Sequence, residues 1–317
     1  MQFLQNIHRV ADYALALVKL VQNREVGWRT LNRKTDKYER EKQPSNAFLR
    51  LWIHEKIIVA GQREASKASS YQIKTFVDFY QINMEEFQPS DLNEYATFED
   101  FFVRQHAVGS CPIFAESDPT KAVVVADSRV VVYPSVSQAQ ALWIKGKNFT
   151  IENLILDPQR ARVWADGGVA SFRLSPQDYH RYHSPVAGKV SWFKQISGDY
   201  YQVDPICLSS NVDILTRNAR CCIGLETKEF GMVLFVAIGA TNVGTVEINE
   251  PLRKTGTDVK KGDEIGLFQF GGCSIIVAFE RDRIKFDEDL LSVSRKRITV
   301  DVEVGMSLGT AFLMPSS

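Results

Sequence analysis

The chain has no apolar run long enough to cross a membrane. Its most apolar stretch near the amino terminus, residues 13–18, is short and ends at Lys19, with Asp12 directly before it. A spanning helix needs roughly 20 apolar residues. The first residues also lack the features of a secretory signal. We therefore expect a soluble protein with at most peripheral contact with a membrane.

An excess of charge of either sign is absent as well. Lys and Arg together number 38, and so do Asp and Glu, so no net field favours nucleic acid or an acidic partner. A disulfide framework is also missing. The five cysteines are an odd number, and Cys221 and Cys222 are adjacent, an arrangement that seldom forms a bridge. These features favour a reducing, cytoplasmic location.

The pattern of the chain changes near residue 110. Before it, three segments have apolar residues at helical spacing, namely residues 8–22, 48–60 and 74–80. Residues 24–42 are rich in cations, as in a solvated face or an exposed linker. Further on, short apolar runs end at turn residues and predict strands. We predict an α+β protein with an N-terminal helical region, 1–110, and a β-rich, antiparallel, barrel-sandwich-like core, 111–317.

Residues 261–280 carry a chemical signal. Two apolar runs with strand composition lie on either side of a glycine pair, at residues 265–270 and 275–279. After Gly271 and Gly272 come the thiol of Cys273 and the hydroxyl of Ser274. A nucleophile next to an unshielded glycine carbonyl can attack it, so Gly272–Cys273 is a candidate cleavage site, with Gly271 and Ser274 supporting it. On this stretch alone, a plain hairpin is the simpler interpretation.

A second group of candidates is the pair His180 and His183. If residues 178–183 form a helical turn, both rings project from one side, within reach of one small ligand. We expect no metal there, because a third ligand and the glutamate of a His-Glu-x-x-His motif are missing. From these residues alone, a pair of hydrogen-bonded structural histidines remains an alternative to a catalytic pair.

Several blocks in order resemble the phosphatidylserine decarboxylase family. Residues 173–188, Arg-Leu-Ser-Pro-Gln-Asp-Tyr-His-Arg-Tyr-His-Ser-Pro-Val-Ala-Gly, resemble its motif Leu-Ser/Ala-Pro-x-Asp-Tyr-His-x-x-His-x-Pro-x-x-Gly. Residues 97–104 resemble its aromatic lead-in, whose rings we expect to pack in a core and to do no chemistry. Residues 271–274 resemble its processing site, Gly-Gly-Ser-Ser, with Cys273 at the position of the serine. The resemblance covers roughly residues 75–310.

The resemblance implies a proenzyme that cleaves itself between Gly272 and Cys273. The new amino terminus would become a pyruvoyl group, a cofactor derived from the chain itself. His180 resembles the histidine that activates the processing nucleophile, and Asp127 resembles the aspartate that orients this histidine, as in a catalytic triad. His183 resembles the residue that assists decarboxylation or supplies the proton that follows it.

The implied activity is that of a carboxy-lyase converting phosphatidylserine to phosphatidylethanolamine. Soluble relatives that decarboxylate aromatic amino acids such as tryptophan give the first alternative. In either case the substrate bears an α-amino acid group, on a small molecule or a phospholipid. Because Cys273 replaces the serine, an uncleaved and inactive form is a second alternative, and a cysteine introduced to trap the proenzyme would look the same. Peripheral membrane contact and a homodimer are compatible with the resemblance, and nucleic acid is not expected.

Overall fold

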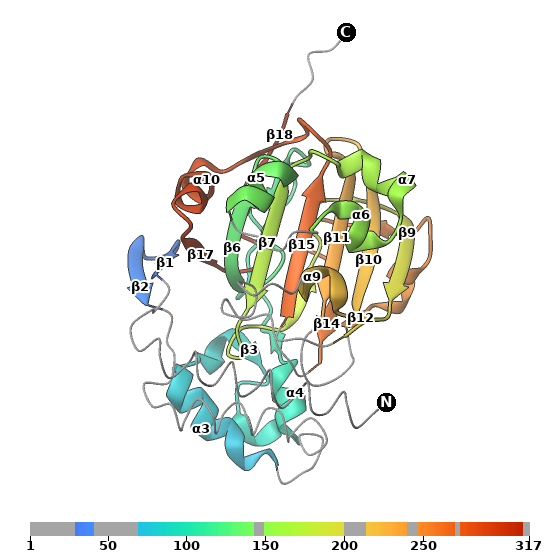
Figure 1. Cartoon of the computed structure of the whole chain (residues 1–317). Helices are drawn as coiled ribbons and strands as arrows, with labels where there is room; N and C mark the ends of the chain where they lie inside the picture. Colours follow the sequence, from blue (N-terminus) through green and yellow to red (C-terminus); the bar gives the residue numbers. More distant parts are fainter. Residues whose placement is uncertain are drawn as a thin grey trace, which may run out of the picture.

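The centre of the molecule is a ten-stranded sheet (Figure 1). The computed structural model describes residues 29–40, 69–142, 149–199, 214–239, 246–269 and 273–312. In spatial order the strands are β13 (Asp258–Val259), β9 (Gly188–Ile196), β10 (Arg220–Thr227), β11 (Gly231–Ile238), β15 (Cys273–Phe279), β7 (Val169–Leu174), β6 (Ser128–Tyr133), β17 (Thr299–Val302), β1 (Arg29–Asn32) and β2 (Lys37–Arg40). Neighbouring strands are antiparallel, except that β1 and β17 run parallel.

Two three-stranded sheets pack against one face of the large sheet. They are β12 (Val246–Ile248), β14 (Glu264–Phe268) and β8 (Arg181–His183), and β16 (Ile284–Phe286), β18 (Ser307–Ala311) and β5 (Lys121–Val123). Strand β15 shows why a core forms here. Its residues Ile275, Val277 and Phe279 belong to the apolar cluster that also contains Phe268 of β14 and Tyr182 of β8, as the two-residue period of a strand requires.

Short helices cover the other face of the large sheet (Figure 1). They are α5 (Val136–Leu142), α6 (Ile151–Ile155), α7 (Pro158–Ala161), η4 (Arg162–Trp164) and α9 (Ile214–Arg217). The alternate residues of β15, Ile276 and Ala278, pack in this second apolar cluster with Trp164. Strand β15 is therefore buried on both faces. Elsewhere, α10 (Glu288–Arg295) packs on β6 and β17, and η5 (Glu250–Arg253) on β9.

A small aromatic unit lies beyond one end of the large sheet (Figure 1). It comprises α3 (Tyr71–Tyr80), η2 (Met84–Glu86), β3 (Phe87–Gln88), η3 (Leu92–Glu94), α4 (Phe98–Phe102) and β4 (Gln105–His106). Its core includes Tyr95, Phe98 and Phe101, as expected for the aromatic block. Helix α4 begins with a capping box. The Thr97 hydroxyl accepts from the N–H of Asp100, and the Asp100 carboxylate accepts from the N–H of Thr97.

The α+β class is confirmed, and the structure refines the helical expectation for the first 110 residues. The helix predicted at 74–80 is present as α3, whereas the helices predicted at 8–22 and 48–60 lie outside the described residues. The cation-rich part that the structure describes, 29–40, is not a linker, and residues 34–38 are exposed, as expected for a solvated face. It forms the β1–β2 hairpin at the edge of the sheet, and its Arg33 pairs with two carboxylates at the start of α10. The division at residue 110 stays a prediction.

The two runs on either side of the glycine pair are strands, as predicted, but they do not form a hairpin. Strand β14 pairs with β8 and β12, while β15 pairs with β11 and β7 in the large sheet. The plain-hairpin interpretation is therefore wrong. The connection between them carries the chain from one sheet to the other. None of the helices in the described part of the chain is long and apolar enough to span a bilayer.

Candidate active site

The predicted cleavage segment is held at both ends by the chain that joins β7 to β8. Phe268, the last residue of β14, donates its N–H to the carbonyl oxygen of His180 at 2.9 Å. Cys273, the first residue of β15, pairs with Leu174, the last residue of β7. Residues 270–272 and the side chain of Cys273 lie outside the described part of the chain. The predicted cleavage bond therefore lies between two anchors, at Leu174 and His180.

Ser274, predicted as a supporting residue of the cleavage site, is in a different situation. It is buried, and it pairs with Arg173 of β7 on one side and Ile238 of β11 on the other. Its backbone is thus part of regular sheet. The cleavage bond predicted for Gly272–Cys273 lies just outside this regular pairing, where β15 begins.

His180 has the properties of a neutral general base. Its Nδ1 lies 2.8 Å from the carbonyl oxygen of Asp178. A carbonyl only accepts hydrogen bonds, so Nδ1 carries the proton and Nε2 carries the lone pair. This Nε2 is buried and has no hydrogen-bond partner among the described residues. Burial, helped by the charge of Arg104, lowers the pKa of His180 to about 3, so the ring is neutral at pH 7.

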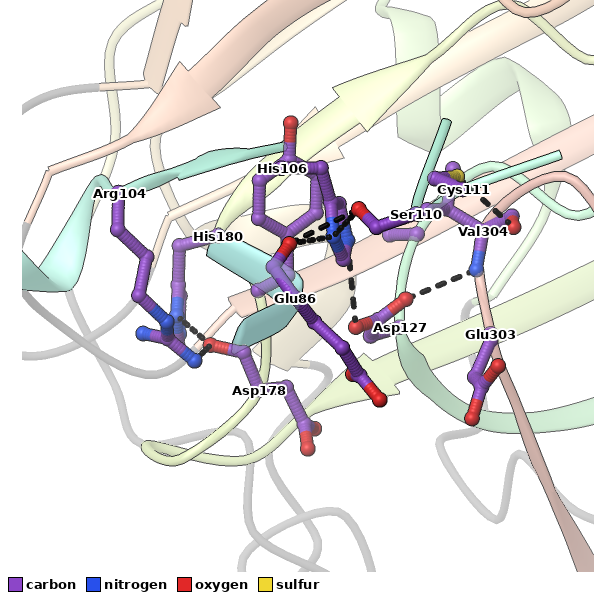
Figure 2. Close-up of polar contacts among 12 residues, drawn as sticks. Glu86, Arg104, His106, Ser110, Cys111, Asp127, Asp178, His180, Glu303 and Val304 are labelled. Carbon is purple, nitrogen blue, oxygen red and sulfur yellow. Dashed lines mark hydrogen bonds and ion pairs between the residues drawn. The ribbon is translucent and has the colours of Figure 1, made fainter. Parts of the chain in front are cut away.

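Asp127 lies in the same region but does not touch the His180 ring. One carboxylate oxygen accepts the N–H of Val304 at 2.8 Å, and the other lies 3.8 Å from Nε2 of His106 (Figure 2). The second distance is too long for a hydrogen bond. Burial raises the pKa of Asp127 to about 7, against the lowering effect of the Val304 N–H. In this structure the group that fixes the tautomer of His180 is the carbonyl of Asp178, and the triad role of Asp127 stays a prediction.

His183 does not project beside His180, because this segment is not a helical turn. His180 directly precedes β8, which contains His183, and residues three apart in extended chain point to opposite faces. The Nδ1 of His183 donates to the carbonyl oxygen of Gly262 at 2.8 Å, and the Tyr179 hydroxyl lies 3.1 Å from its Nε2. Both ring nitrogens are therefore occupied. Burial lowers the pKa of His183 as well.

Four further residues shape the site, and none of them was among the predicted site residues. The ring of Phe102 packs on His180, with 3.7 Å between the centroids. Asp178 supplies the carbonyl that His180 contacts, and its carboxylate is held by Arg129. The fourth is His106, which stands between Asp127 and the backbone of the aromatic unit. The motifs at 97–104 and 173–188 contained Phe102 and Asp178, but only the fold brings these motifs together.

This geometry defines an α+β protein in which a buried neutral histidine lies beside a doubly anchored chain segment. A family model described as phosphatidylserine decarboxylase matches residues 98–310. The chain belongs to the phosphatidylserine decarboxylase family, as its motifs predicted.

Its relatives differ in length. A phosphatidylserine decarboxylase proenzyme 2 of Oryza sativa subsp. japonica is 42% identical over 79% of this chain. One of the same name from Komagataella phaffii is 40% identical over 77%. The matched parts are 40% and 24% of these relatives, so the chain spans well under half of their length. A phosphatidylserine decarboxylase proenzyme of Chlamydia trachomatis is 35% identical over 89% of this chain and 97% of its own length.

Proposed function

We propose that the chain is the proenzyme of a pyruvoyl-dependent phosphatidylserine decarboxylase, matured by cleavage between Gly272 and Cys273. The observation that carries the proposal is the double anchoring of this segment by Leu174 and His180. A strand that begins at the new amino terminus and a buried base next to it are what self-cleavage requires. The relatives named phosphatidylserine decarboxylase proenzymes support the same assignment.

In the proposed maturation, Nε2 of His180 takes the proton of the nucleophile at position 273. The nucleophile then attacks the carbonyl carbon of Gly272, the bond from this carbon to the nitrogen of residue 273 breaks, and this nitrogen takes the proton from His180. With serine at position 273, elimination then releases Gly272 as a carboxyl group and leaves dehydroalanine, and tautomerisation and hydrolysis, with loss of ammonia, would leave the pyruvoyl terminus.

With Cys273 the attack gives a thioester. A thiolate is intrinsically the better nucleophile, but sulfur is larger than oxygen, and displacement of the reacting atom by about 1 Å can cost 100-fold in rate. We therefore expect slow or absent maturation of the cysteine form.

The residues present fit a pyruvoyl group at position 273, because a buried imidazole with an unsatisfied nitrogen lies next to this segment. Such a group supplies an electron sink for loss of carbon dioxide from an amino acid. The chain's own contribution is proton transfer. As the resemblance implies, we assign His183 to assist this transfer. Its Nδ1–H is donated to the Gly262 carbonyl and its Nε2 accepts from the Tyr179 hydroxyl, so the ring must first take up a proton at Nε2 before it can supply one.

The experiment for the substrate uses the Cys273→Ser protein. Carbon dioxide release is measured with vesicles containing phosphatidylserine and, separately, with free tryptophan. We expect release from phosphatidylserine only. Release from tryptophan but not from phosphatidylserine would mean that the substrate is an aromatic amino acid. A cleaved protein that is inert toward both would refute both proposed substrates. Peripheral membrane contact, a homodimer and a cytoplasmic location stay predictions.

A further inference from the structure

Arg104 is a buried cation whose donors go to backbone carbonyls. It follows α4 in the aromatic unit, and only 2% of its surface is exposed. Its Nη2 donates to the carbonyl oxygens of Gln177 at 2.8 Å and Asp178 at 3.3 Å. Its guanidinium carbon lies 4.4 Å from the ring centre of Phe87 and 4.9 Å from that of Phe101. No carboxylate in the described part of the chain forms an ion pair with it.

The carbonyl of Asp178 is shared between two donors. It receives Nδ1–H of His180 at 2.8 Å and Nη2 of Arg104 at 3.3 Å (Figure 2). Because the carbonyl accepts from both, the position of Arg104 sets the direction of the acceptor that fixes the His180 ring. Phe102, two residues before Arg104, packs on the same ring. One short segment of the aromatic unit thus contacts both the ring and its acceptor.

From this arrangement we infer that Arg104 is a positioning residue for His180. It holds the Asp178 carbonyl so that His180 keeps its proton on Nδ1 and presents the Nε2 lone pair to the cleavage segment. The inference assigns the aromatic unit a part in maturation beyond packing. The inference rests on the proposed function only where it concerns the effect of Arg104 on the rate of cleavage. The tautomer of His180 is a property of the uncleaved chain and can be measured without cleavage.

The energetics favour positioning over stabilisation. A buried guanidinium without a carboxylate partner carries an uncompensated desolvation cost. Burial accordingly lowers the pKa of Arg104 to about 10. Its Nε has no hydrogen-bond partner among the described residues, so the burial is only partly compensated. If Arg104 served stability alone, an apolar side chain of similar volume could replace it without loss of stability. Such a side chain could not donate a hydrogen bond to the Asp178 carbonyl.

The first measurement reads the tautomer directly. The whole chain with Cys273 is labelled with ¹⁵N-histidine, and long-range ¹H–¹⁵N spectra report which ring nitrogen carries the proton. The His180 signal is identified by its loss in His180→Gln. We expect a single Nδ1–H tautomer in the parent protein, a mixture or the Nε2–H form in Arg104→Met, and retention of Nδ1–H in Arg104→Lys, which keeps a donor.

A matched control is Arg181→Met. Arg181 also joins the aromatic unit to the core, donating from Nε to the carbonyl oxygen of Val103 at 2.8 Å and from Nη1 to Glu264 at 3.1 Å. It makes no contact with the Asp178 carbonyl. Arg181→Met should therefore lower the melting temperature and leave the His180 tautomer unchanged. An unchanged tautomer in Arg104→Met, or an equal change in Arg181→Met, overturns the inference.

The second measurement is the rate of cleavage in the Cys273→Ser background. We expect Arg104→Met to slow it about 100-fold, the effect of displacing a reacting group by about 1 Å, and Arg104→Lys to recover part of this loss. Equal rates in the methionine and parent proteins contradict the inference. If the serine protein itself stays whole, the proposed function fails, and the tautomer comparison still decides the role of Arg104. If Arg104→Met does not fold, the cleavage rate of Arg104→Lys decides it: the inference expects this variant to cleave more slowly than the parent, because the ammonium replaces the guanidinium in a different position, and a rate equal to that of the parent contradicts the inference.

Discussion

At the scale of single residues, the site depends on burial that keeps ionisable groups neutral. Burial lowers the pKa of His180 to about 3 and raises the pKa of Asp127 to about 7, because it disfavours the charged form of each group. A neutral imidazole with a free lone pair can accept a proton at pH 7, whereas an imidazolium cannot. The same burial makes the ring a weak base, so we expect it to pass the proton to the departing nitrogen in the same step and not to hold it.

The first prediction concerns His180. In the Cys273→Ser background, His180→Ala should slow cleavage by roughly 100- to 10,000-fold, the usual contribution of a general base. Cleavage is followed by gel electrophoresis, with His183→Ala as the companion variant, which should cleave but lose decarboxylase activity. The opposite outcome, blocked cleavage in His183→Ala and normal cleavage in His180→Ala, would exchange the two assignments.

The second prediction concerns the pH dependence of stability through Asp127. Its folded pKa of about 7 lies above the ordinary value near 4 for aspartate. The folded state therefore retains a proton that the unfolded state releases. The contribution of this group to stability is full below about pH 4 and is lost as the pH rises through about 7.

The test compares the parent protein with Asp127→Asn, which mimics the protonated carboxyl and still accepts the Val304 N–H. Urea unfolding gives the free energy of unfolding of both at pH 5 and pH 8. Because the other titrating groups are common to both proteins, the variant should gain stability relative to the parent as the pH rises. An equal difference at both pH values would mean that Asp127 titrates normally in the folded protein.

At the scale of secondary-structure elements, α4 connects the aromatic unit to the site. This helix has only five residues, and its capping box satisfies two N–H groups at its start. Replacing Thr97 by alanine should lower the free energy of unfolding by about 1 kcal/mol, the usual cost of losing a cap. Thr97→Ser keeps the hydroxyl and should have little effect. Equal stability of the two variants in urea unfolding would show that the box contributes nothing.

The sequence predicted elements better than their arrangement. The strand composition of two apolar runs was enough to predict the strands at 265–270 and 275–279. It could not predict that β14 and β15 belong to different sheets, because pairing partners far away in the chain decide this. The pairing of residues 29–40 could not be predicted for the same reason, since the carboxylates that pair with Arg33 come from the start of α10, about 250 residues later.

The site shows the same limit. The resemblance placed His180, His183 and Cys273 in the chemistry, but the contacts between 97–104 and 173–188 exist only in the folded chain. The two histidines were expected to project from one side only if residues 178–183 formed a helical turn. These residues do not form one, because residues 181–183 form β8, which pairs with β14. Local spacing carries no information about that pairing.

At the scale of the whole molecule, cleavage should not separate the two products. Residues 273–312 supply β15 in the middle of the large sheet, and also β16, α10, β17 and β18. The apolar residues of β15 are fully buried between both layers. We therefore expect the fragments 1–272 and 273–317 to elute together in gel filtration and to separate only in denaturant. Separation under native conditions would contradict the fold described for the C-terminal part.

The most direct test of the central claim, that this site cleaves its own chain, is the intact mass of two purified proteins in denaturant. The parent with Cys273 should be mainly uncleaved. Cys273→Ser should give fragments 1–272 and 273–317, with the small one labelled by a carbonyl reagent and blocked to Edman degradation. A parent that is fully cleaved and carries the carbonyl would show that the thiol is competent here. A serine protein that stays whole would contradict self-processing at this site.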